Sequence, residues 1–329
     1  MAIRLKLLKN INHITRSKLF IISMISLIII CNNKVQSQTM DVGVLGGGAY
    51  YLGDINPNLH FAGTQPAYGG FFRYNYRDRW AFRLGAMQSK LKADDQDFQS
   101  INAVQAFIGD DINIDDPNLI YYAISNRGLN FETDITEINF LVEVNFFPFF
   151  VGSKRNTWTP YIFAGGAMYL YNPKPIGGGV NLRDLGTEGQ GIAGRPEPYG
   201  ATAFAIPFGV GLKISLAKRI GLGFEWGMRK TFNDYLDDIS STYYLDLYGY
   251  NPEEGVYYAP NPDNPVEIIA FPISDEVYYS DPTFSHKKGE KRGDQYNNDW
   301  YAFFGVSVTF KINLLKDDGC RDFTRDSYY

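Results

Sequence analysis

Residues 203–240 read AFAIPFGVGLKISLAKRIGLGFEWGMRKTFNDYLDDIS, and their pattern indicates the class of fold. Every second residue on both arms is apolar: Ile206, Phe208, Val210, Leu212, Ile214 and Leu216, then Ile220, Leu222, Phe224, Trp226 and Met228. A period of two on both sides of the short turn at residues 217–219 predicts a β-hairpin. The second face mixes glycine with Lys213, Glu225 and Arg229. This pattern favours a small barrel in lipid, apolar outside and polar within, over a soluble sandwich.

Eight amphipathic segments follow residue 40. They are residues 41–53, 67–76, 80–92, 131–147 and 159–171, the two hairpin arms, and 300–312. The fifth segment is apolar on both faces, so its orientation stays unassigned. Three connections are short (residues 77–79, 149–158 and 217–219) and four are long (54–66, 93–130, 172–202 and 232–299). The sequence therefore predicts an all-β fold, an eight-stranded antiparallel transmembrane β-barrel with short periplasmic turns, long extracellular loops and both termini in the periplasm.

Aromatic residues near the predicted strand ends would form girdles at the two membrane interfaces. They are Tyr50, Tyr51, Tyr76, Trp80, Trp158, Tyr169, Tyr171, Trp226 and Trp300.

The first 37 residues have the composition of a signal peptide. They contain six basic residues and no acidic ones, and an apolar run of 13 residues lies between the basic stretch and Gln36-Ser37. A spanning helix needs about 20 residues, so this run does not predict a membrane anchor. Cys31 raises a lipoprotein alternative, against which Ile30 stands where a small residue is expected. We expect cleavage near residues 35–37, a barrel over residues 38–313 and a periplasmic tail over residues 314–329.

Removal of the signal peptide makes the protein acidic. It takes away six of the 31 Lys and Arg residues and none of the 36 Asp and Glu residues, which leaves a formal charge of −11. A chain of this charge lacks the basic patch that nucleic acids require. Cys320 becomes the lone cysteine, which excludes an intramolecular disulfide.

The inward faces of the predicted strands carry charges of both signs: Arg73, Arg83, Lys213, Arg229 and Lys311 against Glu137, Glu143 and Glu225. An eight-stranded barrel has an interior filled by side chains. An unpaired charge there would cost several kcal/mol, about 3–5 when one partner of a buried pair is removed. We therefore expect a lumen charge network that fixes strand register, and a closed lumen in place of a pore. A functional site at Glu225 and Arg229 is the alternative.

The long loops carry acidic residues that could bind a cation. Asp111, Asn113 and Asp115 have the first three spacings of a calcium loop, but Asp116 stands where glycine is needed and Tyr122 where the bidentate glutamate is needed. We expect a solvated acidic loop there, and the same for Asp234, Asp237 and Asp238, which could instead form a fixed loop base. No metal or cofactor is expected.

An enzymatic alternative rests on Ser285 and His286. Some small outer-membrane barrels modify lipids with a Ser/His pair. Adjacent residues on a strand point to opposite faces, and triad partners normally lie far apart in sequence. We expect His60 and His286 to be exposed loop histidines and the protein not to be an enzyme.

Two stretches resemble the PorG family of outer-membrane barrels. They are IPFGVGLKI with GFEWGMRKTFNDYLDDIS, at residues 206–214 and 223–240, and GGGAYYLGDINP, at residues 46–57. The resemblance implies a non-catalytic outer-membrane component of the type IX (Por) protein secretion system. It also implies two kinds of partner. These are the outer-membrane lipids and the periplasmic ring of lipoprotein PorK and its partner PorN. The alternatives are a stand-alone surface barrel acting as an adhesin or receptor through its Tyr-, Asp- and Asn-rich loops, and the lipid-modifying enzyme.

The C-terminal tail is a candidate docking segment for a periplasmic partner. It is too polar to be a ninth strand, and it places Cys320, Phe323, Tyr328 and Tyr329 among alternating charges. Aromatic residues supply much of the energy of protein interfaces. A disordered terminus is the alternative.

Overall fold

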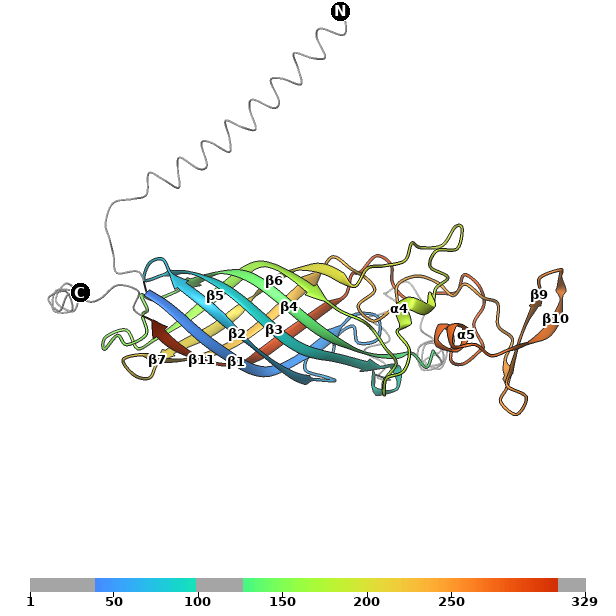
Figure 1. The fold of residues 1–329 in the computed structure, drawn as a ribbon, viewed down its shortest axis with the longest axis horizontal. Coiled ribbons are helices and arrows are strands. Elements are labelled where there is room, and N and C mark those ends of the chain that lie inside the picture. The colour runs from blue at the N-terminus through green and yellow to red at the C-terminus, as the bar shows by residue number, and fades with distance from the viewer. Residues whose placement is uncertain (1–38, 99–126, 313–329) are drawn as a thin grey trace, which may run out of the picture. The chain divides into compact units, whose positions relative to one another are not determined.

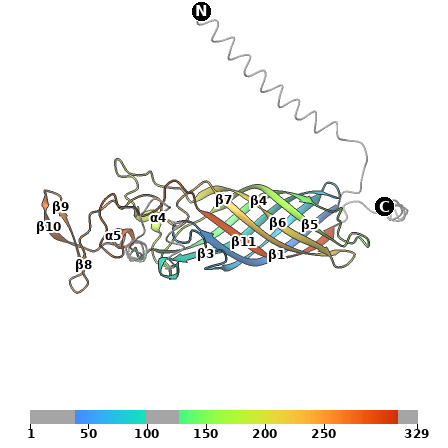
Figure 2. The same ribbon diagram turned by 180° about the vertical axis from the view of Figure 1, so that it is seen from behind.

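The computed structural model describes residues 39–98 and 127–312. The signal peptide, the calcium-like loop at residues 111–122 and the C-terminal tail with Cys320, Phe323, Tyr328 and Tyr329 all lie outside the described residues. The described chain contains a closed barrel of eight antiparallel strands, as the sequence predicts (Figures 1 and 2). In order around the barrel the strands are β1, β11, β7, β6, β5, β4, β3 and β2.

The strands begin and end close to the predicted boundaries. They are β1 (Thr39–Leu52), β2 (Gln65–Asn75), β3 (Trp80–Asp94), β4 (Asn130–Asn145), β5 (Trp158–Leu170), β6 (Thr202–Ser215), β7 (Ile220–Thr231) and β11 (Trp300–Ile312). The hairpin of β6 and β7 pairs Ala205 with Thr231 and Ser215 with Gly221. Pairing of β1 with β11, from Met40 opposite Ile312 to Leu52 opposite Trp300, closes the barrel. Closure leaves no strand edge unpaired, which a barrel in lipid requires.

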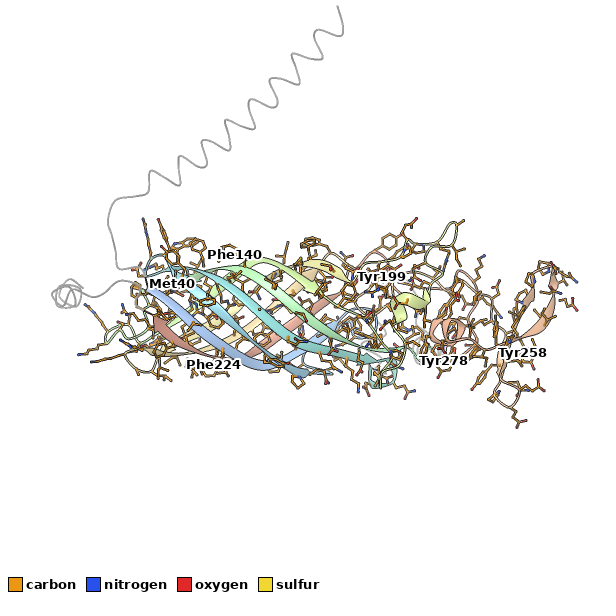
Figure 3. All side chains as sticks on the ribbon, viewed as in Figure 1. Met40, Phe140, Tyr199, Phe224, Tyr258 and Tyr278 are labelled. Atoms are coloured by element: carbon orange, nitrogen blue, oxygen red, sulfur yellow. The ribbon has the colours of Figure 1, made fainter. Side chains whose placement is uncertain are left out.

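The predicted alternation of faces holds on the strands (Figure 3). Phe140, Phe224 and Val308 lie on the outer surface with 52%, 42% and 49% of their surface exposed. The structure also orients β5, which the sequence left open. Its outward residues include Ile162 and Met168, whereas Tyr161, Phe163 and Tyr169 are buried in the lumen.

The girdle prediction is wrong for several tyrosines. Tyr51 and Tyr169 point into the lumen and are buried, as is Tyr171 just beyond β5. Tyr50 lies on the outer side, but the loop after β1 covers it, because Phe61 packs on its ring and His60 hydrogen-bonds to its hydroxyl. Exposed aromatic residues remain at the short-turn end: Trp80 and Trp158, 47% and 51% exposed.

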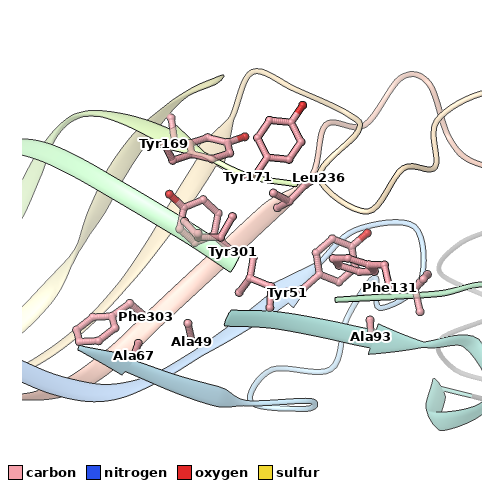
Figure 4. Packing of buried hydrophobic residues seen from close by; sticks show 14 of the residues in the cluster. Ala49, Tyr51, Ala67, Ala93, Phe131, Tyr169, Tyr171, Leu236, Tyr301 and Phe303 are labelled. Carbon is pink, nitrogen blue, oxygen red and sulfur yellow. The ribbon is translucent and has the colours of Figure 1, made fainter. Parts of the chain in front are cut away.

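An aromatic plug fills the loop-side end of the lumen (Figure 4). Side chains from opposite strands meet there: Tyr51 on Phe131, and Tyr169 on Tyr301, with ring centroids 4.8 and 5.6 Å apart. Leu236 and Ile239, from the long connection between β7 and β11, belong to the same buried cluster. The loop chain therefore enters the mouth of the barrel.

The described parts of the long connections contain short helices and strands that the sequence did not predict. They contain the 3₁₀ helix η1 (Asp95–Phe98), the helices α4 (Leu182–Leu185) and α5 (Asp275–Ser280), and the strands β8 (Tyr250–Asn251), β9 (Val256–Asn261) and β10 (Asn264–Pro272). Ser274 caps α5 by accepting a hydrogen bond from the amide of Val277. A small core forms here from Leu247, Ala259, Val277 and Phe284. No helix in the described part of the chain is long and apolar enough to cross a membrane.

Candidate functional site

Eight charged side chains on the strands point into the lumen and are almost completely buried. Four are basic and four acidic: Arg73, Arg83, Lys213 and Arg229, with Asp41, Glu137, Glu143 and Glu225. A buried charge is tolerated when it is paired and hydrogen-bonded. Each of the eight has a partner of opposite charge within 4 Å.

Glu143 is the centre of this lumen network. Its carboxylate lies 2.8 Å from Arg73 Nε, 3.2 Å from Arg83 Nε and 2.6 Å from Lys213 Nζ. Lys213 also donates to Asn145 Oδ1, at 2.8 Å. The strands β2, β3, β4 and β6 are therefore tied together through a single carboxylate.

The other two glutamates extend the network, because Arg83 bridges Glu143 and Glu225 while Glu137 pairs with Arg229. Arg83 binds Glu225 through both terminal nitrogens, at 2.6 and 3.0 Å, and the Tyr161 hydroxyl donates to the same carboxylate. Glu137 accepts a hydrogen bond from Tyr301 at 2.7 Å and lies 3.3 Å from Arg229 Nε. Both pairs link strands across the barrel, a geometry suited to fixing register.

Two members of the network differ from the sequence prediction. Asp41 was not predicted, yet it is buried, lies 3.9 Å from Arg73 Nη1 and accepts a hydrogen bond from Asn75. The alternation of faces along β1 predicts an inward Asp41, because Val44, three residues further on, faces outward. Lys311 was predicted to join the network, but it is half-exposed at the short-turn rim and, among the described residues, has no carboxylate within 4 Å. Its position next to the barrel end lets water solvate the ammonium group.

Side chains occupy the barrel interior. A cavity of about 10 Å³ remains among Leu45, Arg83, Glu225, Arg229 and Phe303, which is room for about one water molecule. The geometry is that of a packed lumen.

A second cluster of charges lies where the loops enter the barrel, and we call it the loop base. Its acidic members are Asp54, Glu188, Asp234, Asp237, Asp238 and Asp299, and its basic members are Arg127 and Arg292. The Tyr51 hydroxyl lies within hydrogen-bond distance of both Asp237 and Asp299. Sequence reasoning expected a solvated loop at Asp237 and Asp238. That expectation is wrong, because both side chains are buried, at 1% and 0% exposed.

The two arginines join segments that are far apart in the sequence. Arg292 donates to the carbonyl oxygen of Asp238 at 2.6 Å and to Glu188 at 3.1 Å. Arg127 pairs with Asp95 at 2.6 Å and donates to the carbonyl oxygen of Asp54. The loop base thus fastens the connections after β1, β3, β5 and β7 to one another.

Burial shifts the titration of the loop-base carboxyls. Removal from water raises the pKa of Asp234 to about 8 and that of Asp237 to about 7, in each case because a buried carboxylate loses hydration. Burial likewise raises the pKa of Asp238 to about 6, against the pull of Arg292. Burial and neighbouring carboxylates raise the pKa of Asp54 and of Asp299 as well. These shifts all favour the protonated forms of the buried carboxyls.

The calcium-like loop at residues 111–122 lies outside the described residues, so the structure bears only on the cluster of Asp234, Asp237 and Asp238. Within residues 39–98 and 127–312, no group of three or more His, Cys, Asp or Glu side chains is arranged to hold a metal ion.

Ser285 and His286 both contact other side chains of the same loop. His286 lies 3.0 Å from Asp281 through Nδ1, and its ring stacks on Tyr243. Ser285 is exposed and its hydroxyl lies 2.8 Å from Thr283 Oγ1. The predicted exposure of His286 is wrong, since only 13% of its side chain is exposed, whereas His60 is exposed as expected. The Asp281–His286 pair orders the loop around α5.

Fold and site together define a closed eight-stranded β-barrel with an apolar outer surface and a charge-balanced interior. The chain belongs to the family described as Domain of unknown function (DUF6089), whose model matches residues 18–106 and 103–243. None of the curated proteins matches the chain.

Among solved structures, three small barrels are similar to this chain. They are the attachment invasion locus protein Ail of Yersinia pestis (TM-score 0.36, 5% identity, 84% of this chain and 100% of that chain covered), Neisserial surface protein A (0.35, 8%, 84% and 98%) and the N-terminal β-barrel domain of Pseudomonas aeruginosa OprF (0.32, 11%, 84% and 98%). Likeness at such identity concerns the fold alone.

Proposed function

We propose that this protein is a non-catalytic outer-membrane barrel of the type IX secretion system. In this role it anchors a periplasmic assembly of the PorK/PorN type, and both of its termini lie in the periplasm. The observation that carries the proposal is a barrel with an apolar exterior and a packed, ion-paired lumen, which suits an anchor better than a conduit.

The outer surface supports placement in the outer membrane. Large apolar side chains cover the outer faces of neighbouring strands, among them Val44, Phe72, Leu84, Ile138, Phe140, Val210, Val306 and Val308, each at least 42% exposed. A closed barrel meets the bilayer's demand that all backbone groups be satisfied internally. Short turns at one end and long loops at the other match the usual orientation, with the short turns facing the periplasm.

The assignment to the secretion system rests on the resemblance to the PorG family. Its most specific stretch, residues 223–240, runs from β7 into the loop base, where Leu236, Asp237 and Asp238 are buried. This placement gives the stretch a structural role in closing the barrel mouth. A partner contact must then come from elsewhere, and we place it on the short-turn side, at residues 146–157 and in the C-terminal tail.

Co-purification after crosslinking tests this proposal. Truncation after Lys316 should leave the barrel assembled but weaken its association with the periplasmic ring lipoprotein, and Cys320 should react with a thiol reagent from the periplasm only. The control is Val266→Asp, a change in β10 at the long-loop end of the protein. This variant should co-purify as the parent does. Undiminished co-purification of the truncated protein would move the contact to residues 146–157. Labelling of Cys320 from outside intact cells would overturn the orientation.

A stand-alone surface receptor or adhesin is the second candidate. It is favoured by the ordered connection between β7 and β11, which has its own small core of Leu247, Ala259, Val277 and Phe284. Two results together would favour this second function over a role in secretion. No ring protein would be crosslinked to the full chain, and changes in this connection would abolish binding to a surface partner.

A further inference from the structure

The connection between β7 and β11 contains a small projecting sheet, and one edge of that sheet is open. The strand order β10-β9-β8 makes β10 an edge strand, and β9 is its strand partner within the described chain (Figure 1). We call residues 248–273, which contain the three strands, the arm. Every residue of β10 is exposed or half-exposed, and Val266 is 92% exposed. A long, exposed, apolar edge is a template for pairing with another chain.

The free edge can be located from one backbone hydrogen bond. The amide of Ile273 donates to the carbonyl oxygen of Gly255 at 3.0 Å, and the register of the two strands places these residues opposite each other. Hydrogen-bonded and non-bonded pairs alternate along an antiparallel ladder. Ile269 and Phe271 therefore direct their backbone groups at β9, and Ile268 and Ala270 direct theirs at the open side. These open N–H and C=O groups are available to a further strand.

The negative charge of the arm indicates which kind of polypeptide segment could pair with it. Residues 248–273 contain four acidic side chains, Glu253, Glu254, Asp263 and Glu267, and no lysine or arginine. All four are exposed. Two copies of the arm would bring like charges together, which opposes self-pairing. A segment with basic side chains gains attraction instead.

We propose that the β10 edge binds an extended, basic segment of another polypeptide by strand addition. Main-chain hydrogen bonds at Ile268 and Ala270 would hold the segment, and the four carboxylates would favour lysine and arginine in it. This activity goes beyond the anchoring role and does not depend on it, since the arm and the short turns lie at opposite ends of the strands.

Binding of synthetic peptides to the full chain in detergent tests the proposal. The probe is a fluorescent peptide of alternating lysine and valine, followed by anisotropy at low salt. Ala270→Pro removes an open-side N–H but no bond to β9, and edge strands tolerate proline there. Ala270→Val keeps the N–H and is the matched control. We expect Ala270→Pro to weaken binding about tenfold, an affinity change equal to one lost main-chain contact of about 1.4 kcal/mol, and Ala270→Val to bind as the parent does.

Two further binding experiments use the unmodified protein. A peptide of the same sequence with N-methylated valines cannot form the ladder and should not bind the unmodified protein. A glutamate–valine peptide should not bind either. Failure of the lysine–valine peptide to bind, equal binding of its N-methylated form, or equal binding by Ala270→Pro would overturn strand addition. Binding of the glutamate–valine peptide, or a dimer held through β10 in sedimentation, would overturn the choice of a basic partner.

Discussion

Glu143 shows how one buried residue can hold a lumen together. Three cations contact its carboxylate, and the lumen balances because four acidic side chains face four basic ones. Loss of the Glu143 carboxylate takes away the ion-pair partner of Lys213, which is costly because water does not reach the buried ammonium group. Buried ion pairs of this kind favour a unique strand register as much as overall stability.

Glu143→Gln should lower the free energy of unfolding by about 3 kcal/mol, the lower end for breaking a buried pair. Adding Lys213→Met removes the excess cation and should recover part of the loss. Glu132→Gln, which breaks a partly exposed pair with Lys90, is the control and should cost less than about 1 kcal/mol. Urea midpoints in detergent measure all three. A double variant less stable than Glu143→Gln would show that charge balance does not govern the lumen.

The loop-base carboxyls predict that stability falls as pH rises. The pKa of Asp234 is about 8 and that of Asp237 about 7 in the folded protein, against about 4 for an unfolded aspartate, so the folded state binds more protons. Their stabilising protons are therefore present at about pH 4 and are lost as pH rises to about 8. The titratable and charged groups that act on these two carboxyls are Tyr51, Asp54, Glu188, Asp238, Asp294, Asp299 and Arg292.

Unfolding midpoints measured between pH 5 and pH 8.5 test this dependence. Asp234→Asn and Asp237→Asn mimic the protonated forms and should flatten the decline. Asp263→Asn, at an exposed position, should leave it unchanged. A midpoint that rises with pH over this range would contradict the prediction.

At the scale of elements, glycine sets how closely strands and lumen side chains approach. A Cβ atom at Gly209 would lie 2.3 Å from the carbonyl oxygen of Trp226 and 2.7 Å from the ring of Phe163. Backbone cannot yield as a flexible side chain can. At Gly166, on β5, a Cβ atom would meet nothing within 4 Å.

Gly209→Ala should therefore destabilise the barrel by about 1–3 kcal/mol, the usual cost of overpacking. Gly166→Ala should be neutral or slightly stabilising, since it lowers the entropy of the unfolded chain. Heat modifiability on a gel, in which folded and boiled protein migrate differently, reports both. Equal behaviour of the two variants would mean that β6 and β7 can separate to admit the methyl group.

Phe224 tests which face of β7 meets lipid. It lies near the middle of the strand on the outer side, 42% exposed. Phe224→Arg should cost about 2–4 kcal/mol and reduce assembly in lipid vesicles, because a basic residue near the bilayer midplane loses its hydration. Val266→Arg on the arm is the control. Should both assemble equally well, the outer face of the barrel is not in lipid.

At the scale of the whole molecule, the packed lumen predicts the absence of a channel. The lumen cavity of about 10 Å³ cannot hold a chain of waters. We expect the full protein, incorporated in a planar bilayer, to show no steady ion conductance. Removing a bulky lumen side chain with Phe163→Ala should still give no open channel, because the aromatic plug and loop base close the mouth. A steady conductance in the unmodified protein would refute the closed lumen.

The barrel could be predicted from local patterns in the sequence. Period-two alternation, eight segments and unequal connections gave strand number, pairing order and the facing of most strands, since lipid-like and lumen-like surfaces impose opposite compositions on alternate residues. It also identified seven of the eight buried lumen charges, because a charged residue on an otherwise alternating strand must face inward.

Other features depend on contacts between segments that lie far apart in the sequence. The facing of β5, apolar on both sides, depended on which neighbours filled the lumen. Asp237 and Asp238 look like solvent-exposed residues in the sequence, and they are buried because Arg292 and Tyr51 reach them from segments more than 50 residues away. The open edge of β10 likewise arises from a sheet within a loop. Local patterns record the environment of a strand, whereas burial of loop charges depends on long-range contacts that no local pattern encodes.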